Sequence, residues 1–153
     1  MQKIRPCLWF DHQAQEAAEF YVSVFGGDSR IVDTTRWTEG SPNAGSVLTV
    51  DFRLEGQEYI ALNGGPEFTF SEAVSLSVDC GSQEEVDRLW GALTEGGEES
   101  VCGWLKDRYG MSWQIVPRVL PELLAGPDTA RADRVMKAMM GMRKLDVRAL
   151  QEA

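Results

Sequence analysis

Two stretches of the chain place apolar side chains at the three- and four-residue spacing of an amphipathic helix. The first runs from about Gln13 to Phe25 and is followed by a glycine pair. Its apolar face consists of Ala17, Phe20, Tyr21, Val24 and Phe25. The second opens with the capping box Ser82–Glu85 and is also followed by a glycine pair. Its apolar face consists of Val86, Leu89, Trp90 and Leu93.

Segments with alternating side chains surround both helices and predict β-strands. Around the first helix they cover residues 4–10, 29–37, 46–54 and 58–63, and the turn Glu55-Gly56 joins the last two. Around the second helix they cover residues 73–79, 99–102, 103–107 and 111–116. Aligned without a gap, Asp11 meets Asp79 and Gln15 meets Gln83. The pattern therefore predicts a βαβββ module that occurs twice.

This pattern predicts one α+β domain over residues 1–153, with modules over 1–65 and 73–117 and a helical tail over 118–153. In the tail, Asp128 and Asp146 are placed to cap helices, and Leu145 and Leu150 to form a hydrophobic staple. A methionine-rich stripe follows Asp128, and we interpret it as core or subunit contact. The stripe consists of Ala132, Val135, Met136, Met139 and Met140.

Strand side chains alternate between two faces, so the residues that pack under the helices can be separated from the rest. Ile4, Pro6, Leu8 and Phe10 are expected to face the first helix. The opposite face is expected to carry Arg5, Cys7, Trp9, Thr49, Asp51, Arg53, Tyr59, Ala61, Asn63, Ala73, Ser75, Ser77, Ser112, Gln114 and Val116. This mixture of small, hydroxyl, amide and aromatic groups is typical of a surface around a cavity. The alternative is that the face rests on a second subunit or on the tail.

Composition and charge narrow the classes of partner. The chain has 153 residues, 43% of them hydrophobic, and a formal net charge of −9. That charge argues against nucleic acid as a partner, and no apolar run is long enough for a signal peptide or a membrane span. Three cysteines without a C-x-x-C spacing favour neither a zinc site nor a disulfide framework. We therefore expect a cytoplasmic protein with reduced thiols.

Several motifs together resemble a known family. They are "LWFD…EAAEFYVSVFG", "GSVLTVDFRLEGQEYIALNGGPEF", "QEEVDRLW", "CGWLKDRYGMSWQIVP" and "RVMKAMMGMRKLD". These are similar to the PhnB-like branch of the vicinal oxygen chelate superfamily, which includes glyoxalase I, extradiol dioxygenases and bleomycin-resistance proteins. The branch is often labelled 3-demethylubiquinone-9 3-methyltransferase. The resemblance implies paired modules that form a curved, incomplete barrel around a pocket, commonly in a homodimer.

Metal enzymes of this superfamily use His, Gln or Glu on the cavity side of particular strands. Carried over by the resemblance, those positions fall on Arg5, Asn63, Ala73 and Gln114. Arginine stays protonated, alanine has no donor atom, and amide oxygens alone are weak ligands. We therefore predict no metal and no cofactor. The chain also lacks a G-x-G turn for an adenosyl-methionine donor, which argues against the methyltransferase label.

The remaining candidates are groups for binding or reaction on the predicted cavity face. Asp51 and Cys7 are the candidate catalytic residues, with Arg5 placed to lower the pKa of the Cys7 thiol, although a buried inert thiol is the other interpretation. His12 is interpreted as a capping or surface residue, and Asp107 as a turn residue. The candidate ligand-binding residues are Arg5, Trp9, Thr49, Arg53, Tyr59, Asn63, Ser75, Trp104, Tyr109 and Gln114.

Three functions follow as hypotheses. The first is a metal-free binding protein for an aromatic or hydrophobic small molecule. The alternatives are an enzyme on a quinone-like aromatic substrate and, in second place, a divalent-metal enzyme of the glyoxalase or dioxygenase type. A homodimer that serves only as a scaffold would have no pocket ligand at all.

Overall fold

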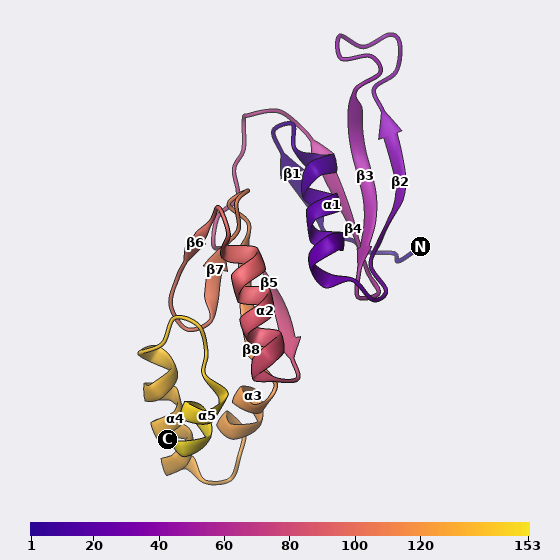
Figure 1. Cartoon of the computed structure of the whole chain (residues 1–153). Coiled ribbons are helices and arrows are strands. Elements are labelled where there is room, and N and C mark those ends of the chain that lie inside the picture. The colour runs from indigo at the N-terminus through magenta and orange to yellow at the C-terminus, as the bar shows by residue number, and fades with distance from the viewer. The chain divides into compact units, whose positions relative to one another are not determined.

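The computed structural model describes residues 1–153 and divides them into two units, Met1–Phe70 and Ser71–Ala153. Each unit contains one four-stranded sheet with a helix on one face (Figure 1). Neither sheet closes into a barrel. The predicted α+β class, the repeated βαβββ order and the helical C-terminal segment are therefore confirmed.

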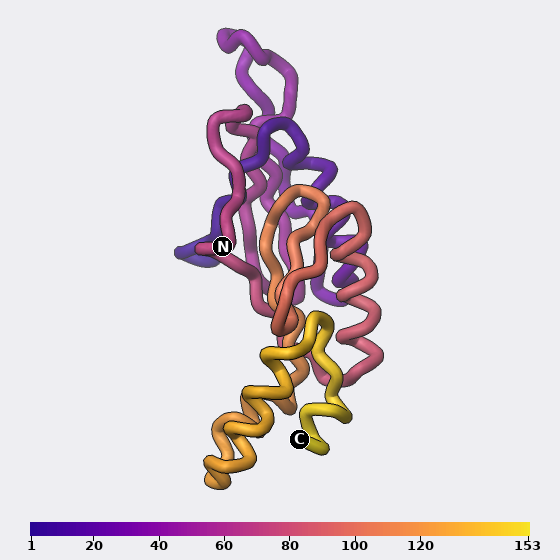
Figure 2. The backbone as a smooth tube through the Cα atoms, turned by 90° about the vertical axis from the view of Figure 1, so that its left-hand side faces the viewer, coloured from indigo at the N-terminus to yellow at the C-terminus, as the bar shows by residue number.

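The first unit consists of one helix and one mixed sheet. Its elements are β1 (Cys7–Phe10), α1 (Ala14–Phe25), β2 (Arg30–Arg36), β3 (Val47–Leu54) and β4 (Gln57–Asn63). The strand order is β1-β4-β3-β2, with β1 parallel to β4 and the other pairs antiparallel. A long loop joins β2 to β3 and extends beyond the other elements of this unit (Figure 2).

Aromatic packing joins α1 to the middle of its sheet. Tyr21 on α1 is fully buried, with its ring centroid 6.2 Å from that of Phe52 on β3. Phe52 in turn stacks on Tyr59 of β4 at 5.3 Å. Large aromatic side chains contribute most of the apolar area in such a core. Phe52 therefore marks the side of the sheet that packs against α1, and the residues paired with it on neighbouring strands lie on the same side.

The predicted phase of β4 is wrong. We expected Tyr59, Ala61 and Asn63 on the face away from the helix, but Tyr59 lies opposite Phe52 in the ladder, and Ala61 is fully buried. The cause is the two-residue turn, in which Glu55 and Gly56 both have positive φ. Such a turn pairs Leu54 with Gln57 and so fixes which β4 residues share a face with the buried residues of β3.

The expected burial of Ile4 and Pro6 is also wrong. Ile4 is 85% exposed, and Pro6 is exposed too. The backbone bends at residues 3–4, and β1 begins only at Cys7. Gln2 instead contacts the β3–β4 turn, since its amide nitrogen donates to the carbonyl oxygen of Gly56 at 3.2 Å.

The second unit repeats the plan with shorter strands. Its elements are β5 (Ser75–Cys80), α2 (Gln83–Thr94), β6 (Glu98–Glu99), β7 (Trp104–Lys106) and β8 (Ser112–Pro117), in the sheet order β5-β8-β7-β6. The predicted capping box is confirmed, because Ser82 Oγ accepts a hydrogen bond from the Glu85 N–H at 3.2 Å. The strand expected over 99–102 is displaced to Glu98–Glu99, because the N–H of Cys102 donates to Met142 O instead of pairing in the sheet. Ala73 lies before β5 begins.

Three helices form the tail of the second unit. They are α3 (Val119–Leu124), α4 (Thr129–Met140) and α5 (Val147–Glu152). Asp128 and Asp146 cap α4 and α5 as predicted. Leu145 and Leu150 are fully buried, together with Leu120 and Val135, and they form a small core of their own. Met136 and Met140 of the methionine stripe are 43% and 63% exposed, so they are not core, and the alternative of a subunit contact stays a prediction.

The helices of the chain run to at most twelve residues. None of them combines the length and the apolar character that a bilayer-spanning helix needs.

Candidate functional site

The face of the first sheet that α1 does not cover carries two rows of mixed side chains. Register pairs Cys7 with Ile60, and Ile60 with Asp51. The next row on the same face pairs Trp9 with Leu62, and Leu62 with Thr49. Directly paired side chains lie on one face of a sheet. We call this surface the open face and define it by Cys7, Trp9, Thr49, Asp51, Ile60 and Leu62.

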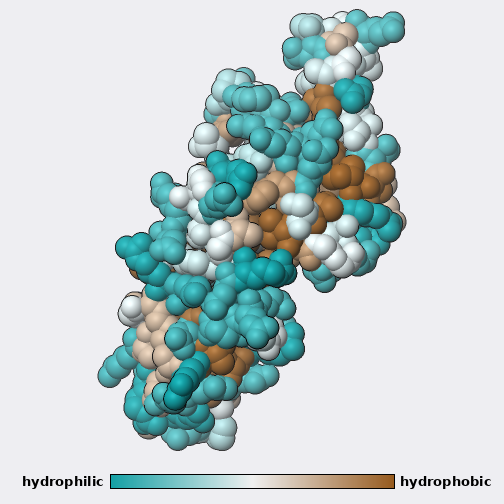
Figure 3. All heavy atoms as spheres, viewed as in Figure 1, coloured by the Kyte–Doolittle hydropathy of each residue, from teal (hydrophilic) through white to brown (hydrophobic).

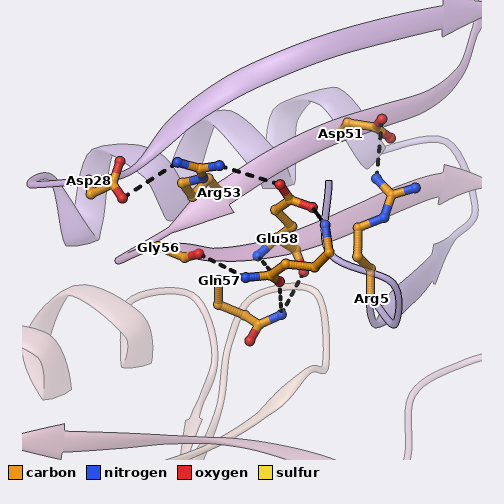
Figure 4. Close-up of polar contacts among 8 residues, drawn as sticks. Arg5, Asp28, Asp51, Arg53, Gly56, Gln57 and Glu58 are labelled. Carbon is orange, nitrogen blue, oxygen red and sulfur yellow. Dashed lines mark hydrogen bonds and ion pairs between the residues drawn. The ribbon is translucent and has the colours of Figure 1, made fainter.

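An ion pair lies at the edge of the open face. Nη1 of Arg5 is 3.3 Å from Oδ2 of Asp51, and these side chains are only 18% and 28% exposed (Figure 4). A partly desolvated pair interacts more strongly than a surface pair, and breaking it leaves one charge without its partner. The structure therefore brings together two of the three charged groups that the sequence placed on this face, Arg5, Asp51 and Arg53.

A second polar cluster surrounds Arg53, which lies on β3 close to the β3–β4 turn. Arg53 lies 3.6 Å from Asp28 and 3.3 Å from Glu58 (Figure 4). The backbone N–H of Gln2 donates to Glu58 at 2.7 Å, and this hydrogen bond is the main cause that lowers the pKa of the Glu58 carboxyl. The Glu58 carboxylate is thereby held between the Arg53 guanidinium and the N-terminal segment. Arg53 is thus engaged within its own unit.

Cys7 lies on β1, in the row of the open face that also holds Ile60 and Asp51. Desolvation raises the pKa of its thiol, and Asp51 adds to the rise, while Arg5 acts in the opposite direction. A raised pKa reduces the fraction of thiolate, which is the nucleophilic form. The structure thus favours a protonated thiol at Cys7, against the expectation that Arg5 activates it.

We predict that Cys7 reacts with iodoacetamide more slowly at pH 7 than free cysteine does, and that its rate rises with pH. Asp51→Asn is expected to increase the rate, because it removes a charge that raises the pKa, and Arg5→Met to decrease it. Peptide mass spectrometry after timed labelling separates Cys7 from Cys80 and Cys102. Equal Cys7 rates in both variants and the parent chain would contradict this account.

Trp9 is held rigidly at the end of the open face. Its indole N–H donates to the carbonyl oxygen of Gly65 at 2.9 Å, and Phe68 meets its ring edge-on at 5.0 Å. A Cβ added at Gly64 would lie 2.6 Å from the indole Cδ2, so only glycine permits this close approach. A fixed aromatic side chain contributes contact area to a ligand without losing further conformational entropy.

Tyr59 and Asn63 lie on the helix side of the sheet and not on the open face. Burial raises the pKa of the Tyr59 hydroxyl. Asn63 Oδ1 accepts from the N–H of Ala14 at 2.8 Å, and Nδ2 donates to Val47 O at 3.1 Å. Asn63 therefore satisfies the first N–H of α1, which its sequence position did not reveal.

The second sheet has a comparable uncovered face within its own unit. Gln114 lies in register with Ser77 and with Trp104, and its amide donates to Ser75 Oγ at 3.0 Å. Ser112 is 1% exposed, and its hydroxyl makes no hydrogen bond. The predicted grouping of Ser75, Ser112 and Gln114 on one face is thus confirmed, while their role in binding stays a prediction.

Asp107 organises the β7–β8 turn, as predicted. Its Oδ1 accepts from the N–H groups of Tyr109 and Met111 at 2.8 and 3.1 Å. Its Oδ2 accepts from the indole of Trp113 at 2.9 Å. Tyr109 therefore lies within a turn that this carboxylate fixes.

The positions that hold a metal in related enzymes do not form a ligand set here. Arg5 is paired with Asp51, and both amide atoms of Asn63 are bonded to the backbone. Gln114 donates to a serine, and Ala73 contributes no donor. No group of three or more His, Cys, Asp or Glu side chains comes together anywhere in the chain. The residues present do not fit a divalent cation, so no reaction step is derived through one.

A cavity of about 580 Å³ lies in the first unit beside the β2–β3 loop. It is lined by Asp11, His12, Gln15, Trp37, Asn43, Ser46, Val47, Asn63, Gly64 and Gly65. Sequence reasoning found only Asn63 among these as a candidate. The available signal was a loop of ten residues between two strands, longer than most hairpin loops, with Trp37 at its start.

Three comparisons place the chain among known proteins. The family model described as 3-demethylubiquinone-9 3-methyltransferase matches residues 2–116. The PhnB protein from Bacillus cereus is 36% identical, with a TM-score of 0.69 over 76% of this chain and 99% of that one. Protein PA1353 from Pseudomonas aeruginosa is 21% identical, with a TM-score of 0.64 over 76% and 98%. No match was found among the curated proteins.

Proposed function

Because the chain belongs to the 3-demethylubiquinone-9 3-methyltransferase-like (PhnB-like) family of the vicinal oxygen chelate superfamily, we propose that it binds a small aromatic or hydrophobic molecule on the open face, without a metal. The ligand is a flat, mainly apolar compound that carries at least one polar group. Its apolar part packs on Trp9, Ile60 and Leu62, and its polar group lies near Thr49 and the Arg5–Asp51 pair.

One observation carries this proposal. The open face places the apolar side chains of Ile60 and Leu62 beside an ion pair, on a sheet face that carries no helix of its own unit. Binding sites for small molecules combine an apolar surface with a few fixed polar groups in this way. The Arg5–Asp51 pair supplies donors and acceptors whose geometry is already set before a ligand arrives.

The family label does not define the activity of this chain. Neither sheet has the doubly wound parallel order that usually holds a nucleotide-like methyl donor, since each contains a single parallel pair. The raised pKa of Cys7 also argues against a thiolate nucleophile. The open face therefore supports binding better than catalysis on a quinone-like substrate.

We predict that 2-naphthol, used as a probe, shifts the methyl signals of Ile60 and Leu62 and the indole signal of Trp9 in two-dimensional NMR spectra. Asp51→Asn is expected to weaken this binding about tenfold, because it leaves Arg5 without its partner, a loss of about 1.4 kcal/mol. The control is Glu16→Gln, which removes an equal charge from an exposed carboxylate on α1, the helix on the opposite side of the sheet. It is expected to leave the affinity unchanged.

Two results would argue against the open face as the binding surface. In the first, 2-naphthol shifts no signal from Trp9, Ile60 or Leu62. In the second, the Asp51 and Glu16 variants lose affinity equally, which would show that overall charge matters and the local pair does not.

A further inference from the structure

The cavity beside the β2–β3 loop is lined by the β1–α1 turn, by the start of α1, by the loop with the start of β3, and by the end of β4 with the two glycines after it. Asn63, which lines it, is on the helix side of the sheet. All ten lining residues belong to the first unit. A volume of about 580 Å³ lies within the range of small-molecule sites, which is roughly 300–1,000 Å³.

The lining is unusually polar for such a site. Its only large apolar groups are Trp37 and Val47, and the rest are amides, a hydroxyl, a carboxylate, an imidazole and two glycines. Figure 3 shows mainly hydrophilic side chains over the tip of the β2–β3 hairpin. Sites for apolar ligands are lined mainly by hydrophobic groups. The cavity therefore suits a hydrophilic ligand.

The charges in the lining argue for a neutral ligand. No Lys or Arg lines the cavity, so no cationic side chain of that kind is present to pair with a phosphate or a carboxylate. The one carboxylate, Asp11, lies 3.5 Å from the imidazole of His12. The N-terminal end of α1 carries a partial positive charge beside Asp11 and offsets the attraction of a cation.

The remaining hydrogen-bonding groups of the cavity lining include both donors and acceptors. Gln15 donates from Nε2 to Glu19, which leaves its carbonyl oxygen as an acceptor for the cavity. The side-chain amide of Asn43 and the indole N–H of Trp37 make no hydrogen bond within the chain. Hydroxyl groups can both donate to and accept from such a set.

The loop that carries Trp37 and Asn43 is organised before any ligand binds. The N–H of Trp37 donates to Ser46 O at 2.9 Å, and the N–H of Gly45 donates back to Trp37 O at 3.1 Å. Ser46 bonds the carbonyl oxygen of Asn43 twice, through its N–H at 3.1 Å and its hydroxyl at 2.6 Å. A wall held in this way loses little entropy when it orders a ligand.

We infer that this cavity is a binding site for a neutral, hydroxyl-rich ligand of the sugar class. The ring of Trp37 packs against the C–H face of the ligand, while Gln15, Asn43 and Asp11 bond its hydroxyl groups. The inference concerns other residues than those that define the open face and another class of ligand, although Gly64 and Gly65 of the lining contact Trp9.

The test is a titration of the full chain with methyl glucoside, maltose and cellobiose, each to about 50 mM, followed through the Trp37 indole and Asn43 side-chain signals in NMR spectra. At least one of these sugars is expected to bind in the millimolar range. Asn43→Ala and Trp37→Leu are expected to weaken that binding about fivefold or more. Glu39→Ala is the matched control, because Glu39 is exposed in the same loop but does not line the cavity.

Two charged probes, one cation and one anion, distinguish a site for neutral ligands from a site for ions. Tetramethylammonium and inorganic phosphate are expected to leave the Trp37 and Asn43 signals unchanged. The inference is overturned if none of the three sugars shifts those signals, if a charged probe does so instead, or if the Glu39 variant weakens sugar binding as much as the Asn43 variant. Each variant's NMR spectrum shows whether it is folded, and Asn43→Ala removes no hydrogen bond within the chain.

Discussion

Asp107→Ala is expected to lower the free energy of unfolding by about 3–4 kcal/mol, which is large for a single side chain. The carboxylate is 2% exposed and accepts three hydrogen bonds, two from backbone N–H groups and one from the indole of Trp113. Alanine would leave these donors without an acceptor in a turn that water reaches poorly, and buried donors without partners are costly. Urea denaturation followed by tryptophan fluorescence measures the loss.

Two further variants test that explanation. Asp107→Asn keeps an acceptor oxygen but cannot accept from all three donors, so we expect about half of the loss. Asp133→Ala removes an exposed carboxylate on α4 and is expected to change stability by less than about 0.5 kcal/mol. A loss below about 1 kcal/mol for Asp107→Ala would contradict the role given to this turn.

Gly97→Ala is expected to destabilise the second unit by more than about 3 kcal/mol, because no side chain fits at this position. A Cβ on Gly97 would overlap the carbonyl oxygen of Lys106 and lie 2.7 Å from the carbonyl carbon of Asp107. Both neighbours are backbone atoms, so they cannot rotate away. The β6 and β7 strands would have to separate, and thermal denaturation should show a much lower midpoint.

Gly91→Ala is the matched control for Gly97→Ala. Gly91 lies within α2, is exposed, and has nothing within 4 Å of an added Cβ. Alanine has the higher helix propensity, so we expect a gain of about 0.5–1 kcal/mol. The same substitution should therefore have opposite signs at two positions six residues apart in the sequence. A gain or a neutral result at Gly97 would contradict the close approach of the two backbone segments.

Local signals in the sequence were sufficient for much of the fold. The capping residues Ser82, Asp128 and Asp146 were identified correctly, because a cap depends on a few neighbouring residues. The repeated module and its family were recognised from motifs, although the matched family region ends at residue 116 and leaves the tail outside. Asp107 was also interpreted correctly from its position before Gly110.

The faces of β4 were assigned wrongly although the necessary signal was present. The turn Glu55-Gly56 fixes the pairing of β3 with β4, and counting outward from it places Tyr59 opposite Phe52. The predicted burial of Ile4 was wrong for another reason, because alternation alone cannot show where a strand begins. Apolar residues near a chain end gain burial only if another element covers them.

The candidate site could be predicted in part. Arg5 and Asp51 were placed on one face from alternation, and the structure pairs them at 3.3 Å. The direction of the Cys7 pKa could not be foreseen, since it depends on desolvation and on Asp51 as well as on Arg5. The cavity lined by Trp37 and Asn43 was missed because the conformation of a long loop depends on contacts that no periodicity reveals.

The central claim is that the first unit binds a small organic molecule without a divalent metal. Native mass spectrometry of the chain as purified, before and after incubation with equimolar Mn²⁺, Ni²⁺ and Zn²⁺, tests it most directly. The account predicts a folded protein that retains no metal ion and that gains the mass of 2-naphthol when the probe is added, a gain that denaturation removes. A divalent ion retained in stoichiometric amount, with no gain from the probe, would contradict it.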